Sequence, residues 1–172
     1  MRRLLAMLAL TVCALVFGSV ASASAATVTG ECQIAGTATF SPNGLTALPQ
    51  TLTYNFGGNG TCTGTLNGAS IIQAPVSASA TGTGTLSCAA AVATGGTGQL
   101  SFPNQGVTIP FHIDLVGTGS EVTFTIAGNG GGNGVGHASF GSNATRATEC
   151  NTPTGVNNLG FDVQAAAVNL TG

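Results

Sequence analysis

Three ionisable side chains lie close together in the sequence, in a pattern that could support chemistry. His112 and Asp114 are two residues apart, and Glu121 follows after a short loop. Residues two apart on a strand share a face, and a hairpin would bring Glu121 to the same surface. Such a set could hold a metal ion weakly or act as an acid–base pair. The alternative, which we favour, is the solvated face of a sheet, because side-chain bases two residues apart on a strand are about 7 Å apart. We therefore predict no metal and no cofactor.

Cysteines are the second group with chemical potential. Four of them, Cys32, Cys62, Cys88 and Cys150, follow the first 26 residues. An even number in an exported chain predicts two disulfides, for which three connectivities exist. Zinc is disfavoured because no two of these cysteines form a Cys-x-x-Cys pair. We favour Cys32–Cys62 with Cys88–Cys150, since the first pair flanks one continuous run of predicted strands.

The first 26 residues have the pattern of a secretory signal peptide. Arg2 and Arg3 precede an apolar run over 4–20, and only Ala and Ser occupy 21–26. Cleavage would follow Ala23 or Ala25. The alternative is a retained membrane anchor, against which the small-residue end of the segment argues. We predict a signal peptide over 1–26 and one domain over 27–172, secreted or associated with the cell envelope.

The charge balance limits the partners of the predicted mature domain. Arg146 would be its one strong cation against five carboxylates, a net charge of −4; the carboxylates are Glu31, Asp114, Glu121, Glu149 and Asp162. A basic patch cannot be built from one arginine, so nucleic acid is excluded as a partner. Binding to a membrane after removal of the signal peptide is not expected, for the same reason. A cell-envelope component, a glycan or a protein remains as a candidate ligand.

Sequence signatures of catalysis are scarce. The chain has neither a Gly-x-Ser-x-Gly nor a His-Glu-x-x-His motif, and it has no Trp to serve as a sugar platform. Active sites also need donors or cations that stabilise developing charge, and Arg146 would be the single cationic side chain available. We predict that the protein is not an enzyme and assign no catalytic residue. An enzyme or a weak metal-dependent binder using His112, Asp114 and Glu121 is the alternative.

Alternation of apolar and polar residues predicts an all-β fold. It is clearest over 51–56, 109–116, 121–127 and 161–164, and the second and third segments would form a hairpin through the four-residue loop "GTGS". A short helix is predicted over 142–149. Eight to ten strands with one solvated face indicate an antiparallel β-sandwich, Ig-like or jelly-roll-like, with a closed β-barrel as the second choice.

Threonine and glycine are frequent in the predicted strands. In "TCTGTLNG" (61–68) and "TGTGTLSC" (81–88), hydroxyls alternate with Leu and Cys, which predicts a wet and a buried face. Ice binding through Thr-x-Thr rows is a further alternative, although no fixed repeat would stack the rows. The glycine-dense segment 128–141 is interpreted as a hairpin connection or a bulged strand, since no Asp or Lys accompanies the glycines.

The segments "CQIAGTATFSPNGLT" (32–46), "GTCTGTLNG" and "GTGTLSC" resemble a group of small exported, Gly/Thr-rich, four-cysteine proteins of actinobacteria. The resemblance implies secretion and a β-rich fold, and it implies no activity. Together with the composition, it leads us to expect a secreted, disulfide-braced, non-catalytic protein. Its role would be that of an extracellular or cell-envelope binding or structural component.

Overall fold

Eight long strands and one short helix make up the computed structural model, which describes residues 25–141 and 144–172. The predicted signal peptide lies outside the described residues except for its last two positions, and it stays a prediction. In chain order, the elements are β1 (Thr27–Ser41), β2 (Gln50–Leu66), β3 (Ala69–Leu86), β4 (Ala90–Phe102), β5 (Val107–Thr118), β6 (Glu121–Gly128), β7 (Gly131–Phe140), α1 (Ala144–Glu149) and β8 (Asn158–Thr171).

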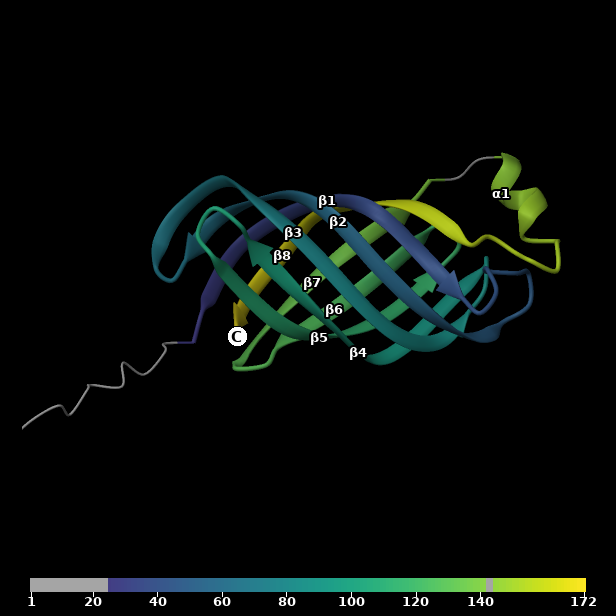
Figure 1. Cartoon of the computed structure of the whole chain (residues 1–172), viewed down its shortest axis with the longest axis horizontal. Coiled ribbons are helices and arrows are strands. Elements are labelled where there is room, and N and C mark those ends of the chain that lie inside the picture. Colours follow the sequence, from purple (N-terminus) through teal and green to yellow (C-terminus); the bar gives the residue numbers. More distant parts are fainter. Residues whose placement is uncertain (1–24, 142–143) are drawn as a thin grey trace, which may run out of the picture.

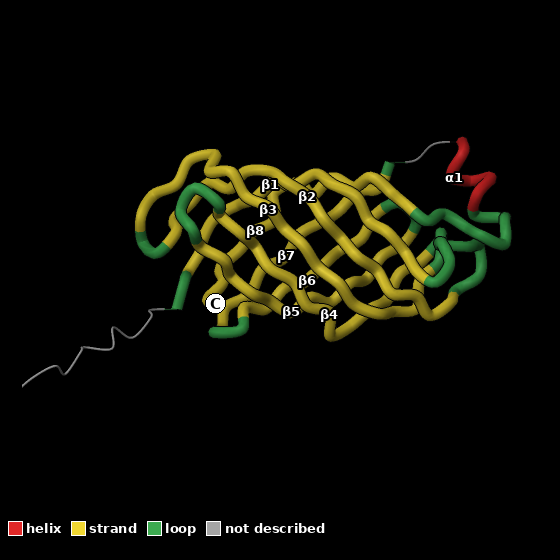
Figure 2. The backbone as a smooth tube through the Cα atoms, viewed as in Figure 1, coloured by secondary structure: helices red, strands yellow, loops and turns green. Residues whose placement is uncertain are grey.

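The strands form a closed antiparallel barrel in which each strand pairs with the next and β8 pairs with β1 (Figures 1 and 2). The β-sandwich expected from the sequence is therefore wrong, and the second choice, a closed barrel, is the observed architecture. The closing ladder decides this point, because it pairs Ile34 with Val163 and Gly36 with Phe161. Alternation shows only that one face of each strand is buried. In a barrel, the buried faces of all strands meet in one interior, and no strand is left at a sheet edge.

The predicted inward and outward faces are confirmed in all four segments. Leu52 and Tyr54 are buried and Thr51 is exposed, and the same alternation follows β5, β6 and β8. Threonine and serine hydroxyls lie on the outside, where Thr53 and Thr83 approach to 3.5 Å across neighbouring strands. The rows of threonine and serine hydroxyls thus belong to the solvent-exposed surface of the barrel. Ice binding through the Thr-x-Thr rows stays an alternative prediction.

Two local predictions need adjustment. The β5–β6 hairpin is confirmed, but its loop is Gly119–Ser120 alone, because Gly117 pairs with Val122 and Thr118 with Glu121. The predicted short helix is confirmed as α1, while positions 142 and 143 fall outside the described residues. Segment 128–141 consists of a hairpin turn and strand β7. This strand carries a bulge against β8 between Val135 and His137, so the segment has features of both predicted forms, the hairpin connection and the bulged strand.

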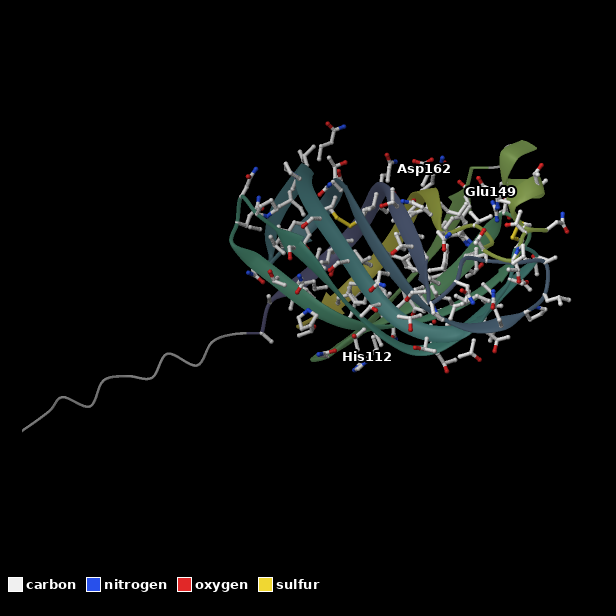
Figure 3. All side chains as sticks on the ribbon, turned by 45° about the vertical axis from the view of Figure 1, so that its right-hand side comes forward. His112, Glu149 and Asp162 are labelled. Atoms are coloured by element: carbon white, nitrogen blue, oxygen red, sulfur yellow. A yellow bond between two sulfur atoms is a disulfide. The ribbon has the colours of Figure 1, made fainter. Side chains whose placement is uncertain are left out.

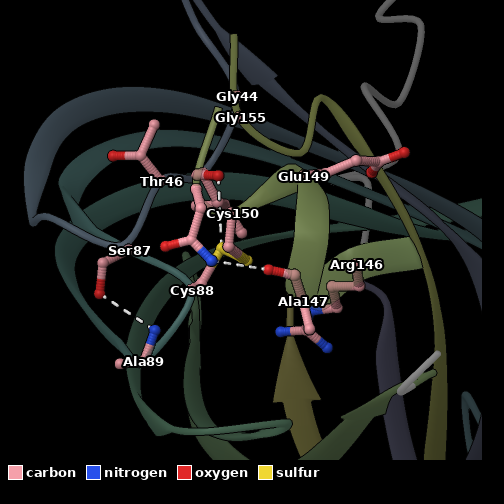
Figure 4. Close-up of a disulfide and its surroundings, with 12 residues drawn as sticks. Gly44, Thr46, Ser87, Cys88, Ala89, Arg146, Ala147, Glu149, Cys150 and Gly155 are labelled. Atoms are coloured by element: carbon pink, nitrogen blue, oxygen red, sulfur yellow. Dashed lines mark hydrogen bonds between the residues drawn. A yellow bond between two sulfur atoms is a disulfide. The ribbon is translucent and has the colours of Figure 1, made fainter. Parts of the chain in front are cut away.

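Both disulfides have the connectivity favoured from the sequence. Cys32–Cys62 joins directly paired residues of β1 and β2 inside the barrel. Cys88–Cys150 joins the β3–β4 turn to the residue that follows α1 (Figure 4). Two such bonds belong to a protein that matures in an oxidising compartment.

Several large side chains in the interior face glycines on the neighbouring strand. Register pairs join Tyr54 to Gly82, Phe111 to Gly98, and Phe124 to Gly136. A Cβ atom at any of these three glycines would overlap the aromatic side chain opposite it. Alternation of small and large residues is how a narrow barrel accommodates aromatic rings.

Candidate functional site

His112, Asp114 and Glu121 all lie on the outside of the barrel, and the structure does not gather them into one site. His112 and Asp114 are exposed on β5, as the period of two requires. Asp114 pairs with Thr125, whereas Glu121 pairs with Thr118. Four residues along the strand therefore separate Asp114 from Glu121, which is about 13 Å.

These ionisable side chains have separate surroundings. Asp114 accepts a hydrogen bond of 2.7 Å from the backbone amide of Gly95. His112 lies on the opposite side of the barrel from Asp162 and Glu149 (Figure 3). The second histidine, His137, contacts the Thr123 hydroxyl at 3.1 Å. Within the described residues, no three His, Cys, Asp or Glu side chains come close enough together to hold a metal ion.

A cavity of about 90 Å³ lies inside the barrel and is the first candidate for a functional site. Five phenylalanines line it: Phe56, Phe111, Phe124, Phe140 and Phe161. The other lining side chains are aliphatic or small, apart from Cys32, which is in a disulfide, and Ser79, which lies on the outward face of β3. One water needs about 10–15 Å³ and two to four polar partners, so this space has room for several waters but no partners for them.

Three of the phenylalanines that line the cavity come from the consecutive strands β5, β6 and β7. Phe111 comes from β5, Phe124 from β6 and Phe140 from β7, each at an inward position of its strand. Phe161 of β8 contacts both Phe56 and Phe140, with ring centroids 5.8 and 6.3 Å apart. Aromatic rings therefore make up much of the cavity wall and present polarisable faces and edges to whatever occupies it.

A second, smaller cavity of about 30 Å³ adjoins the first at the end of the barrel near α1. We call it the mouth cavity. The two cavities share the lining residues Phe56, Leu115, Val122 and Phe140. The mouth cavity adds Ser87 and Arg146, so it is the place where the apolar interior meets polar side chains.

The chain that closes this end is fixed by several covalent and backbone links. Cys150 is bonded to Cys88, and its carbonyl accepts a hydrogen bond from the amide of Ala47 (2.8 Å). An isolated β-bridge joins Leu45 to Val156. Segments 42–49 and 144–157 are thus linked to each other and to the β3–β4 turn at this end of the barrel, and we call them the cap (Figure 4). The C-terminus lies at the opposite end of the barrel, where the amide of Gly172 donates to the carbonyl of Ala26 (Figure 1).

A third space lies outside the barrel between α1 and the start of β8. This outer hollow of about 690 Å³ is lined by Arg146, Glu149 and Asp162 together with residues of β1 and β8. Arg146 therefore borders both the mouth cavity and the outer hollow. Sequence reasoning marked Arg146 only as the single strong cation of the domain and did not place it in a site.

The interior cavity was also missed by sequence reasoning. Alternation predicts that the inward phenylalanines are core residues. It does not predict which residues of the neighbouring strands lie beside them, and so it does not predict the cavity. A signal was present at the inward positions of β7 and β3 that carry the small residues Ala138, Ala78 and Ala80, all of which line the cavity. Such small residues leave space only if the wall curves around a common interior, which the sequence pattern does not reveal.

Comparisons with known proteins add no assignment to this geometry. No family model matches the sequence, no curated protein matches it, and no solved structure matches the chain. Across residues 25–141 and 144–172, no helix combines the length and the apolar character that crossing a membrane would require.

Proposed function

We propose that this chain is an exported, non-catalytic binding protein that encloses a small apolar molecule, or the apolar part of a larger one, inside its barrel. The observation that carries the proposal is the cavity of about 90 Å³ with its five phenylalanines. Eight strands make a barrel whose interior is either filled by side chains or holds one small ligand. Here the interior side chains leave space.

The character of the cavity supports an apolar ligand. Ligand pockets are lined mainly by hydrophobic and aromatic side chains, which this cavity has in excess. A ligand with an uncompensated polar group inside would lose its hydrogen bonds to water, at a cost of about 1–3 kcal/mol. An apolar ligand gives up no hydrogen bonds when it enters the cavity, and it gains dispersion contacts with the rings.

The outside of the protein supports a role in an aqueous, oxidising space. The exposed strand positions carry mostly neutral hydroxyl and amide side chains, and both disulfides are formed. Together with the predicted signal peptide, these features favour a location outside the cytoplasm. A soluble shell around a dry interior is what carriage of an apolar molecule through water demands.

The test compares toluene with phenol, which have the same shape and differ by a methyl and a hydroxyl group. The processed, oxidised domain is titrated with each compound, and amide NMR shifts are followed. We expect saturable toluene binding with a Kd on the order of 1 mM, with shifts at the inward residues of β5–β8. Phenol should bind at least about fivefold more weakly. Absence of saturable toluene binding, or shifts confined to the outer face, would refute the proposal.

A further inference from the structure

The three spaces at the α1 end of the barrel follow one another from inside to outside, and Arg146 lies between the last two. The interior cavity shares four lining residues with the mouth cavity. The mouth cavity shares Arg146 and Leu159 with the outer hollow. A molecule in the interior that extends toward α1 would therefore reach Arg146 at the wall of the mouth cavity.

Arg146 is a cation in a partly desolvated place. Its side chain is half-buried, and its Nη1 donates to the carbonyl of Gly141 at 3.4 Å. Burial lowers the pKa of the guanidinium, because desolvation disfavours its charged form. A guanidinium carries five N–H donors in a planar fork, so it can bind several acceptors at once.

The carboxylates near Arg146 lie on the outer side. Glu149 and Asp162 line the outer hollow, and neither lines the mouth cavity. In Figure 4, the side chain of Glu149 extends away from Arg146. Among the described residues that line the mouth cavity, Arg146 is the one charged side chain. The one charged residue in the described lining of the mouth cavity is thus a cation, whereas the outer hollow also has two acids.

We propose that the ligand is an anionic amphiphile whose hydrocarbon tail occupies the interior cavity and whose carboxylate or similar head group binds Arg146 in the mouth cavity. This inference rests on the proposed function and adds the chemical class of the ligand. The mouth cavity, at about 30 Å³, is two to three times the space that one water needs, which suits a compact head group. Arg146 would then be a specificity-determining residue.

The experiment uses three ligands with the same tail and different heads: octanoate, 1-octanol and octylammonium. Binding to the processed, oxidised domain is measured by NMR titration at low ionic strength. We expect octanoate to bind about tenfold more tightly than octanol, which corresponds to about 1.4 kcal/mol, and octylammonium to bind most weakly. Added salt should weaken the binding of octanoate and leave that of octanol unchanged or stronger.

Two variants assign the effect to the guanidinium. In R146Q, octanoate should lose its advantage over octanol, while the circular dichroism spectrum shows that the variant folds. In R146K, which keeps the positive charge, octanoate should retain a preference over octanol. The ranking of the three ligands on the unaltered protein needs no variant, so the proposal remains testable if R146Q does not fold.

The outcomes separate the two proposals. If octanoate and octanol bind equally and R146Q changes neither, the interior binds apolar molecules but the anionic class is wrong. If octylammonium binds best, the anionic class is also wrong. If none of the three ligands binds, and toluene fails as well, the proposed function falls and this inference falls with it.

Discussion

The carboxylate of Asp114 accepts a 2.7 Å hydrogen bond from the backbone amide of Gly95 on the neighbouring strand. Gly95 lies in a bulge of β4, where the pairing with β5 passes from Ala93–Leu115 to Gly96–Ile113, and its φ is +70°. A bulge leaves one residue out of the ladder, and here a side chain supplies the lost acceptor. The structure thus gives Asp114 a local structural role.

Replacement of Asp114 should therefore affect stability. We expect D114A to lower the free energy of unfolding by about 1 kcal/mol, because the bulge amide loses a charged acceptor and regains only water. H112A on the same exposed face of β5 is the control and should change stability by less than about 0.5 kcal/mol. Chemical denaturation followed by circular dichroism measures both. Equal effects of the two substitutions would contradict this role.

The hydroxyl of Tyr54 is buried without a hydrogen-bond partner among the described residues. It lies against the inward glycines Gly82 and Gly96, where a Cβ atom would overlap it. Burial, and to a lesser degree the negative charge of Asp114, raises the pKa of Tyr54 above its ordinary value.

The raised pKa predicts alkaline instability with a definite sign. In the unfolded chain, Tyr54 ionises near pH 10, while the folded protein keeps the proton to higher pH. Above pH 10 the folded state therefore binds more protons than the unfolded state, so stability falls from pH 10 up to the raised pKa. This is the one tyrosine of the chain, which has no Lys, and the four cysteines of the domain are in disulfides. Ultraviolet difference absorbance and denaturation at pH 9 to 11 measure the effect.

Y54F is the matched control for the alkaline prediction. It removes the hydroxyl that has no partner and keeps the ring against the glycines. At neutral pH, its stability should equal or exceed that of the original protein by up to about 1 kcal/mol. Its stability should also stay constant between pH 9 and 11. A steep alkaline loss in Y54F would show that another group causes the transition.

Much of the fold followed from local sequence, and its closure did not. Alternation placed Leu52, Ile113 and Phe161 inside and Thr51 outside, because the period of two acts residue by residue. The same pattern fits a sandwich, whose buried face meets a second sheet. The distinction lies in the β1–β8 ladder, for example Ile34 with Val163, and no local rule reports a pairing between the two ends of a chain.

The candidate site was less predictable than the strands. The shared face of His112 and Asp114 was predicted correctly, but Glu121 falls too far along the hairpin to join them. The cavity depends on the sum of side-chain volumes around a ring of eight strands, which no single segment contains. Arg146 of α1 lines the mouth cavity, and Cys88–Cys150 ties the residue after α1 to the β3–β4 turn. The sequence indicated that pairing without indicating that it would bring Arg146 near the interior.

The disulfide of the cap should have a local effect as well as a global one. C88S/C150S should lower the free energy of unfolding by about 2–4 kcal/mol, since the unfolded chain is no longer cross-linked. It should also make segment 144–157 sensitive to proteolysis, while the far-ultraviolet spectrum keeps its β character.

C32A/C62A is the matched control for the cap, because it removes a disulfide within the barrel wall and leaves Cys88–Cys150 intact. It should lower stability without exposing 144–157 to protease. Mass spectrometry of the cleavage products locates the cut sites. Equal resistance of 144–157 in the two double variants would show that the cap is held by its backbone contacts alone.

Two adjacent alanines of β8 provide a direct test of the interior. Ala166 is buried and lines the cavity, whereas Ala167 is exposed on the outer face. A166L should fill much of the space of about 90 Å³ and weaken toluene binding at least about tenfold, at a cost in stability of about 1–3 kcal/mol. A167L adds the same side chain outside and should leave toluene binding unchanged. A166V, a smaller change, should weaken binding by an intermediate factor if A166L folds poorly. Equal toluene affinities in A166L and A167L would place the bound molecule outside the barrel, because only one of these side chains points to the interior.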